Sequence, residues 1–93
     1  MKVTVIHEEN HGFIGVATTQ RAAWRWILEK GWFSAYDDIW IYDQCEYVPA
    51  CDIIGKPAEE ISDDEFIDWL IDNIGPQYQT CFTFTTKKVF DVE

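Results

Sequence analysis

Two different periods of apolar and polar residues follow one another along this chain of 93 residues. The segment Lys2–Glu8 is rich in β-branched residues, which is typical of a strand, and Phe13–Ala17 predicts a second strand. Between them, Asn10-His11-Gly12 has turn chemistry, because glycine adopts positive φ angles without strain. The sequence therefore predicts an N-terminal β-hairpin.

A helical period follows the hairpin. Thr18 or Thr19 is expected to cap the helix, Gln20–Lys30 to form its body, and Gly31 to end it. One face carries apolar residues that we expect to pack on the sheet, with Trp26 half exposed on its flank: Ala23, Trp24, Ile27 and Leu28. The opposite face carries charged residues at i, i+4 spacing, which we expect to be solvated: Arg21, Arg25 and Glu29.

The middle of the chain has a weaker pattern. Asp38–Asp43 predicts a short strand bounded by acidic residues. Proline cannot donate a hydrogen bond to a central sheet, so Pro49 makes Tyr47–Ile54 a loop or an edge segment. The group Gly55-Lys56-Pro57 interrupts the chain again.

The second helix has the clearest signals. Ser62-Asp63-Asp64-Glu65 has the form of a capping box, in which Ser62 caps Glu65 and Glu65 bonds back. Gly75-Pro76 is expected to end this helix. Its apolar face is expected to consist of Ile67, Leu70, Ile71 and Ile74.

Polar and aromatic residues alternate again near the C-terminus. Tyr78–Thr86 predicts a strand with one aromatic face, which continues or folds back through Lys87-Lys88 to Val92. We therefore expect an α+β fold, with a small antiparallel sheet (the N-terminal β-hairpin plus the C-terminal strand) packed with two helices. Residues 1–93 are expected to form a single domain, because chains of this length rarely hold two cores.

Negative charge is concentrated in one segment. Asp37–Asp72 holds 12 of the 17 acidic residues and one base, Lys56, so its formal charge is −11 where the whole chain carries −10. Such asymmetry predicts repulsion of nucleic acid and anionic membranes, and attraction to a basic surface. With 16% aromatic residues, the chain also has more rings than a small interior easily buries, so some aromatics are expected at the surface.

The second helix carries a row of acidic residues at i, i+4, i+8, namely Asp64, Asp68 and Asp72. No lysine or arginine lies between Glu60 and Asn73, so we expect the repulsion within this row to be unrelieved. Carboxylates at regular intervals are similar to the phosphates of a nucleic-acid strand. The alternative is an ordinary solvated face or a generic acidic interaction module. We predict that the partner-binding residues are Asp37, Asp38, Asp43, Glu46, Asp64, Asp68, Asp72 and Trp40.

Catalytic motifs are sparse. His7-Glu8-Glu9-Asn10-His11 matches the H-E-x-x-H pattern of zinc hydrolases, but that chemistry requires a helix and the motif lies in a predicted strand and turn. We therefore keep a zinc-dependent hydrolase only as a remote alternative. Acidic pairs at a helix start usually serve as caps and dipole partners. We expect no enzyme activity, no catalytic or metal-binding residue and no cofactor.

The segment types that would direct the chain elsewhere are missing from the sequence. No apolar run has the length of a membrane span, and the N-terminus lacks the basic and apolar regions of a signal peptide. We expect a cytoplasmic protein with reduced, mostly buried thiols at Cys45, Cys51 and Cys81. A Cys45–Cys51 disulfide in an oxidising compartment is the alternative.

In length, acidity and aromatic content the chain resembles the small proteins that phages and mobile elements encode against host defence, of the anti-CRISPR and anti-restriction type. The comparable segments are M-K-V-T-V-I-H-E…F-I-G-V-A-T-T-Q-R-A-A-W and E-E-I-S-D-D-E-F-I-D-W-L-I-D. The resemblance covers overall character and has no diagnostic motif, so it assigns no residue. It implies a non-enzymatic inhibitor in the bacterial cytoplasm, which binds a nuclease or effector complex at a basic site for nucleic acid. From the negative charge we expect no direct binding of nucleic acid, and the sequence leaves the formation of a homodimer open.

Overall fold

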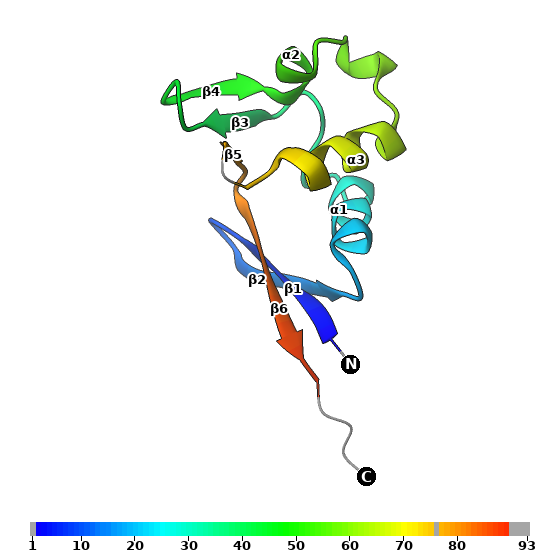
Figure 1. The fold of residues 1–93 in the computed structure, drawn as a ribbon. Helices are drawn as coiled ribbons and strands as arrows, with labels where there is room; N and C mark the ends of the chain where they lie inside the picture. The colour runs from blue at the N-terminus through cyan, green and yellow to red at the C-terminus, as the bar shows by residue number, and fades with distance from the viewer. Residues whose placement is uncertain (1, 76, 90–93) are drawn as a thin grey trace.

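The computed structural model describes residues 2–75 and 77–89, which fold into strands, helices and one short 3₁₀-helix (Figure 1). The predicted stop at Pro76 and the continuation to Val92 lie outside the described residues. The expected α+β class is confirmed. In chain order the elements are β1 (Lys2–Glu8), β2 (Gly12–Ala17), α1 (Gln20–Glu29), β3 (Asp38–Ile41), β4 (Glu46–Pro49), α2 (Ala50–Ile54), η1 (Ala58–Glu60), α3 (Asp63–Asn73), β5 (Tyr78–Gln79) and β6 (Phe82–Lys88).

Sheet A contains the predicted N-terminal hairpin and has the strand order β2-β1-β6. Both pairings are antiparallel, and the register between β1 and β2 shifts after Ile6, which is a β-bulge. The turn residue Gly12 has a φ of 73°, a left-handed conformation that residues with a side chain rarely adopt. Lys2 lies opposite Lys88, so basic residues gather at the far end of this sheet.

Sheet B has the order β4-β3-β5 and lies at the opposite end of the molecule (Figure 1). The predicted strand at Asp38 is confirmed, and Pro49 ends the edge strand β4, where no central ladder needs its missing N–H. The helix α2 follows directly after Pro49, within the segment that we predicted as loop or edge. Pro49 is the N-cap of this helix and has an extended ψ of 138°.

The predicted C-terminal strand is divided between the two sheets. Residues Tyr78–Gln79 pair with β3 as β5, whereas Phe82–Lys88 pair with β1 as β6. Buried Thr80 and half-buried Cys81 form the connection between the sheets. The strands therefore belong to two small sheets instead of the single sheet that we expected.

Both predicted helices form with the expected N-caps. The hydroxyl of Thr19 accepts a hydrogen bond from the Ala22 N–H at 3.0 Å, and that of Ser62 accepts one from Glu65 at 3.1 Å. Glu65 does not make the return bond of the capping box. Its carboxylate binds Lys56 Nζ at 2.8 Å instead.

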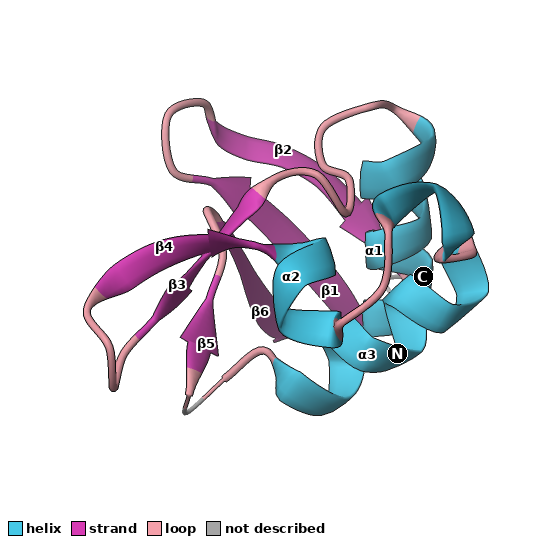
Figure 2. Ribbon diagram, turned by 90° about the horizontal axis from the view of Figure 1, so that it is seen from above, coloured by secondary structure: helices cyan, strands magenta, loops and turns pink. Residues whose placement is uncertain are grey.

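The core lies between the helices and the two sheets, with strands on one side of the molecule and helices on the other (Figure 2). Trp24 of α1 is central to it, and its ring contacts the rings of Phe33, Phe82 and Phe84. The predicted faces of both helices are confirmed at Ala23, Trp24, Ile27, Ile67 and Leu70, all of which are buried. Among the described residues, no helix is long and apolar enough to span a membrane.

Candidate protein-binding surface

The acidic row on α3 faces the basic residues of α1. Arg21 lies 2.6 Å from Asp68, and Arg25 lies 2.5 Å from Asp64. The expectation of an unrelieved row is therefore wrong. The arginines are about half exposed, in keeping with the expected solvated face, and they also pair with α3. The physical reason is that α1 and α3 pack side by side, so two residues at i, i+4 on one helix meet two on the other.

These ion pairs offset the negative charge of the acidic row but add little to the stability of the fold. Asp64 and Asp68 remain largely exposed, so solvent screens each pair and its net contribution is at most about 1 kcal/mol. Their charges are nevertheless offset locally. Among the described residues, only Asp72 of the three has no base within 4.0 Å.

A second group of carboxylates carries more uncompensated charge. The single base of the acidic segment, Lys56, is bound by Glu65. Within the part of the chain that the structure describes, nine exposed acidic residues of this segment have no base within 4.0 Å: Asp37, Asp38, Asp43, Glu46, Asp52, Glu59, Glu60, Asp63 and Asp72. We call the members that lie on sheet B with its β3–β4 turn, on α2 and on η1 the acidic layer: Asp38, Asp43, Glu46, Asp52, Glu59 and Glu60.

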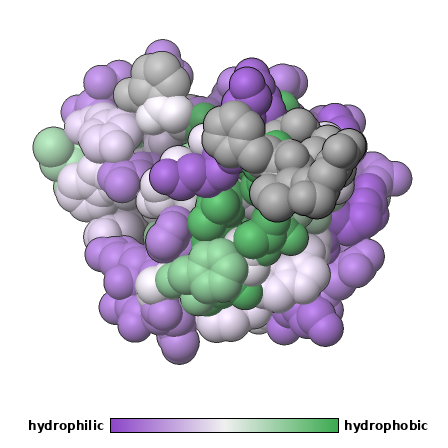
Figure 3. All heavy atoms as spheres, turned by 90° about the horizontal axis from the view of Figure 1, so that it is seen from below, coloured by the Kyte–Doolittle hydropathy of each residue, from purple (hydrophilic) through white to green (hydrophobic). Residues whose placement is uncertain are grey.

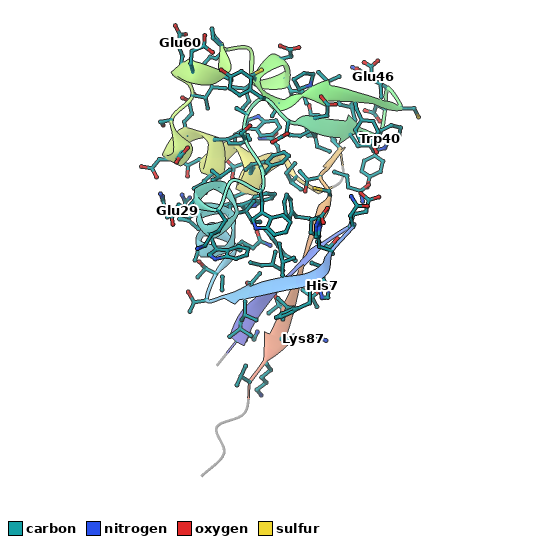
Figure 4. All side chains as sticks on the ribbon, turned by 180° about the vertical axis from the view of Figure 1, so that it is seen from behind. His7, Glu29, Trp40, Glu46, Glu60 and Lys87 are labelled. Carbon is teal, nitrogen blue, oxygen red and sulfur yellow. The ribbon has the colours of Figure 1, made fainter. Side chains whose placement is uncertain are left out.

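The acidic layer occupies one end of the molecule. Figure 4 places Glu46 and Glu60 at the end opposite Lys87. The β3–β4 hairpin lies on one side of Figure 1 and the α1–α3 pair on the other, so the two predicted acidic groups are not brought together. Asp37 has a local role, because its carboxylate accepts a hydrogen bond from the Ser34 N–H at 2.7 Å.

An inter-sheet cleft of about 750 Å³ opens beside the acidic layer. One wall comes from the β1–β2 hairpin and the other from β3 and β4, with the β5–β6 connection between them. The cleft includes two predicted residues, Asp38 and Trp40. The sequence did not predict that the other lining residues lie together, because they come from segments far apart in the chain. Those used below are His7, Glu8, Glu9, Tyr47 and Cys81.

The H-E-x-x-H segment lies on β1 and the following turn, as we expected, and does not form a helix. His11 Nδ1 forms a short hydrogen bond with Glu8, whose carboxylate also accepts from the Asn10 N–H at 3.1 Å. Among the described residues, no three histidine, cysteine, aspartate or glutamate side chains are grouped as metal ligands. The motif therefore holds the hairpin turn in place.

We expect Glu8 to make folding stability sensitive to acid. Its side chain is buried, and the hydrogen bond from His11 holds the pKa of Glu8 below its ordinary value of 4.5. A carboxylate with a depressed folded-state pKa adds stability above its unfolded-state pKa, and this stability is lost as the pH falls through the folded-state pKa. The wild type should thus lose stability more steeply below about pH 4.5 than Glu8→Gln does, as urea denaturation at several pH values would measure. Glu9→Gln, which changes an exposed neighbour, should keep the wild-type slope.

The three cysteines are free thiols. Cys45 is exposed, and Cys51 and Cys81 are half buried, so the expectation of mostly buried thiols is wrong. The alternative Cys45–Cys51 disulfide is not formed either. Partial burial, followed by the charge of Glu8, raises the pKa of the Cys81 thiol. Its thiolate fraction is therefore low, which disfavours nucleophilic chemistry in the cleft.

No protein-family model, curated protein or solved structure matches this chain. The likeness to anti-defence proteins therefore rests on the character of the sequence alone.

Proposed function

We propose that this protein is a non-enzymatic inhibitor that binds the basic surface of a nucleic-acid-binding protein, such as a nuclease or defence effector in a bacterial cytoplasm. The acidic layer is the contact surface, and it occupies the site that the partner uses for nucleic acid. The proposal keeps the nucleic-acid mimicry inferred from the sequence but assigns it to a different set of acidic residues. The residues that carry it are those of sheet B, α2 and η1 instead of the row on α3.

The observation that supports this proposal most is the unequal pairing of the acidic residues. The carboxylates of the acidic layer are exposed and have no base within 4.0 Å among the described residues, whereas Asp64 and Asp68 are ion-paired. Unpaired like charges at one end of a fold repel one another, and a basic partner relieves that repulsion. Such a surface also steers association with a positively charged groove.

The alternative is a generic interaction module that binds through aromatic residues. It is supported by the exposed rings of Tyr36 and Tyr47, which are 67% and 66% accessible. The two functions differ in their response to salt. Exposed ion pairs are screened over a Debye length of about 8–10 Å at moderate ionic strength, whereas aromatic contacts are little affected. Binding that survives high salt therefore favours the generic module.

We expect loss of two unpaired carboxylates to weaken partner binding about tenfold, at about 0.7 kcal/mol for each exposed charge contact. The variant is Asp43→Asn with Glu46→Gln, which alters only the outer end of the β3–β4 hairpin. The partner is first captured from bacterial lysate at low salt on the immobilised protein and identified. Its affinity for the wild type and the variant is then measured by calorimetry at two salt concentrations.

The matched control is Asp64→Asn with Asp68→Asn, which changes the net charge by the same two units. Because Arg21 and Arg25 already offset these carboxylates, the control should bind within about twofold of the wild type. The captured protein should also lose its bound nucleic acid when this protein is added. Equal effects of the two double variants, or simultaneous binding of nucleic acid, would contradict the proposal.

Self-association is a secondary proposal. The exposed apolar residues Phe13 and Val16 of sheet A support it. Seen from the sheet A end, apolar side chains gather at the centre of the molecule with hydrophilic ones around them (Figure 3). This face is separate from the acidic layer, so a homodimer would leave the acidic layer free.

A further inference from the structure

The inter-sheet cleft carries the negative charge that a cation-binding site needs. Glu9 contributes from the hairpin wall and Asp38 from the opposite wall, whereas the carboxylate of Glu8, which also lines the cleft, is bound by His11 and the Asn10 N–H. Among the described lining residues there is no lysine or arginine, and His7 is the one basic side chain. Acidic residues of both sheets thus line a space of about 750 Å³, which is larger than one side chain needs.

Aromatic rings form one side of this cleft. The ring centroids of Trp40 and Tyr47 lie 4.8 Å apart with an interplanar angle of 59°, across the β3–β4 pair. Trp40 is half buried but does not belong to the apolar residues that pack against the core. The ring of Trp40 thus contacts Tyr47, and the part that stays exposed can contact another partner. Figure 4 shows Trp40 and His7 on the same side of the molecule, one above the other.

Hydrogen bonds hold the backbone at the floor of the cleft. The hydroxyl of Thr80 accepts a hydrogen bond from the Phe82 N–H at 3.2 Å and donates one to the Phe82 C=O at 3.3 Å. The Glu9 N–H donates to the Cys81 C=O at 2.9 Å, which fixes the hairpin wall against the connection between the sheets. These bonds fix the backbone of the hairpin wall relative to the connection between the sheets.

We propose that the inter-sheet cleft binds the guanidinium group of an arginine side chain that projects from the basic partner, an inference that rests on and sharpens the proposed function. The planar guanidinium stacks on the ring of Trp40 and donates hydrogen bonds to Asp38 and Glu9. A lysine ammonium group is a compact, strongly hydrated charge that fits such a planar aromatic and carboxylate site less well. Phosphate groups of nucleic acid are repelled by the same carboxylates.

The test uses a small probe and needs no partner. N-acetyl-arginine amide is titrated into ¹⁵N-labelled protein, and N-acetyl-citrulline amide, its neutral isostere, serves as the control ligand. The indole N–H signal of Trp40 should shift with arginine, and citrulline should bind about tenfold more weakly because it lacks the charge. Equal binding of the two ligands, or shifts confined to residues outside the cleft, would overturn the proposal.

Variants of the cleft residues test where arginine binds. Trp40→Leu and Asp38→Asn should each weaken arginine binding about fivefold or more. Their controls, Tyr36→Leu and Asp52→Asn, alter an exposed aromatic ring and an exposed carboxylate that lie outside the cleft and should leave it unchanged. If the controls weaken arginine binding as much as the cleft variants do, the acidic layer attracts cations without a defined site. Partner binding that depends on salt and on Asp43 and Glu46 would still support the proposed function in that case.

Discussion

Replacement of Trp24 by alanine is expected to destabilise the protein by about 4 kcal/mol, because large-to-small changes of buried aromatics leave a cavity that the core fills only in part. The side chain is 2% exposed. Its ring centroid lies 4.9 Å from that of Phe84 and 5.9 Å from that of Phe82, so its loss removes these contacts between α1 and β6. For a domain of this size, each kcal/mol lowers the melting temperature by about 4–8 °C, so a decrease of roughly 15–30 °C is expected in thermal circular dichroism.

The control for this prediction is Tyr36→Ala, which removes an aromatic ring that is 67% exposed. Surface changes of this kind usually alter stability by about 0.5 kcal/mol or less. The hydroxyl of Tyr36 also binds Glu59 at 3.2 Å, but both groups are in solvent. A Trp24→Ala variant that melted at the same temperature as Tyr36→Ala would contradict the placement of Trp24 at the centre of the core.

Replacement of Thr80 by valine is expected to destabilise the protein by about 1–3 kcal/mol, although the two side chains have the same shape. Thr80 is buried, and its hydroxyl is the acceptor for the Phe82 N–H, so valine leaves that amide without this hydrogen bond. Urea denaturation would measure the loss. Because this connection joins the two sheets, the indole signal of Trp40 should also move in the variant.

Thr80→Ser keeps the hydroxyl and removes only a methyl group. It should therefore retain the hydrogen bonds to Phe82 and the wild-type position of the Trp40 signal, with a smaller loss of stability than Thr80→Val shows. The reverse order of stability would show that the methyl group matters more than the hydrogen bonds.

Local chemistry explains which parts of the fold the sequence predicted. The caps at Thr19 and Ser62 act within three residues of themselves, so the helix starts were visible in the chain. The division of Tyr78–Lys88 was not visible, because its alternating pattern suits either sheet equally well. Only the pairing of β3 with β5 and of β1 with β6 decides where the strand breaks.

The acidic surface illustrates the same limit. The spacing of Asp64 and Asp68 matches that of Arg21 and Arg25, and this match was a signal for inter-helix pairing that the sequence did contain. Whether the two helices lie side by side depends on packing, which is not encoded in either helix alone. The inter-sheet cleft could not be predicted for a related reason, because its lining comes from segments that are distant in the chain.

The separation of acidic layer and basic sheet end has a consequence for how this protein meets another molecule. The acidic end carries Glu46 and Glu60, while Lys87 and the Lys2–Lys88 pair lie at the other end (Figure 4). In the proposed function, a positively charged groove attracts the acidic layer more than the basic end of sheet A, so sheet B is expected to arrive first. For such an electrostatically steered encounter, added salt should slow the association rate more than it speeds dissociation.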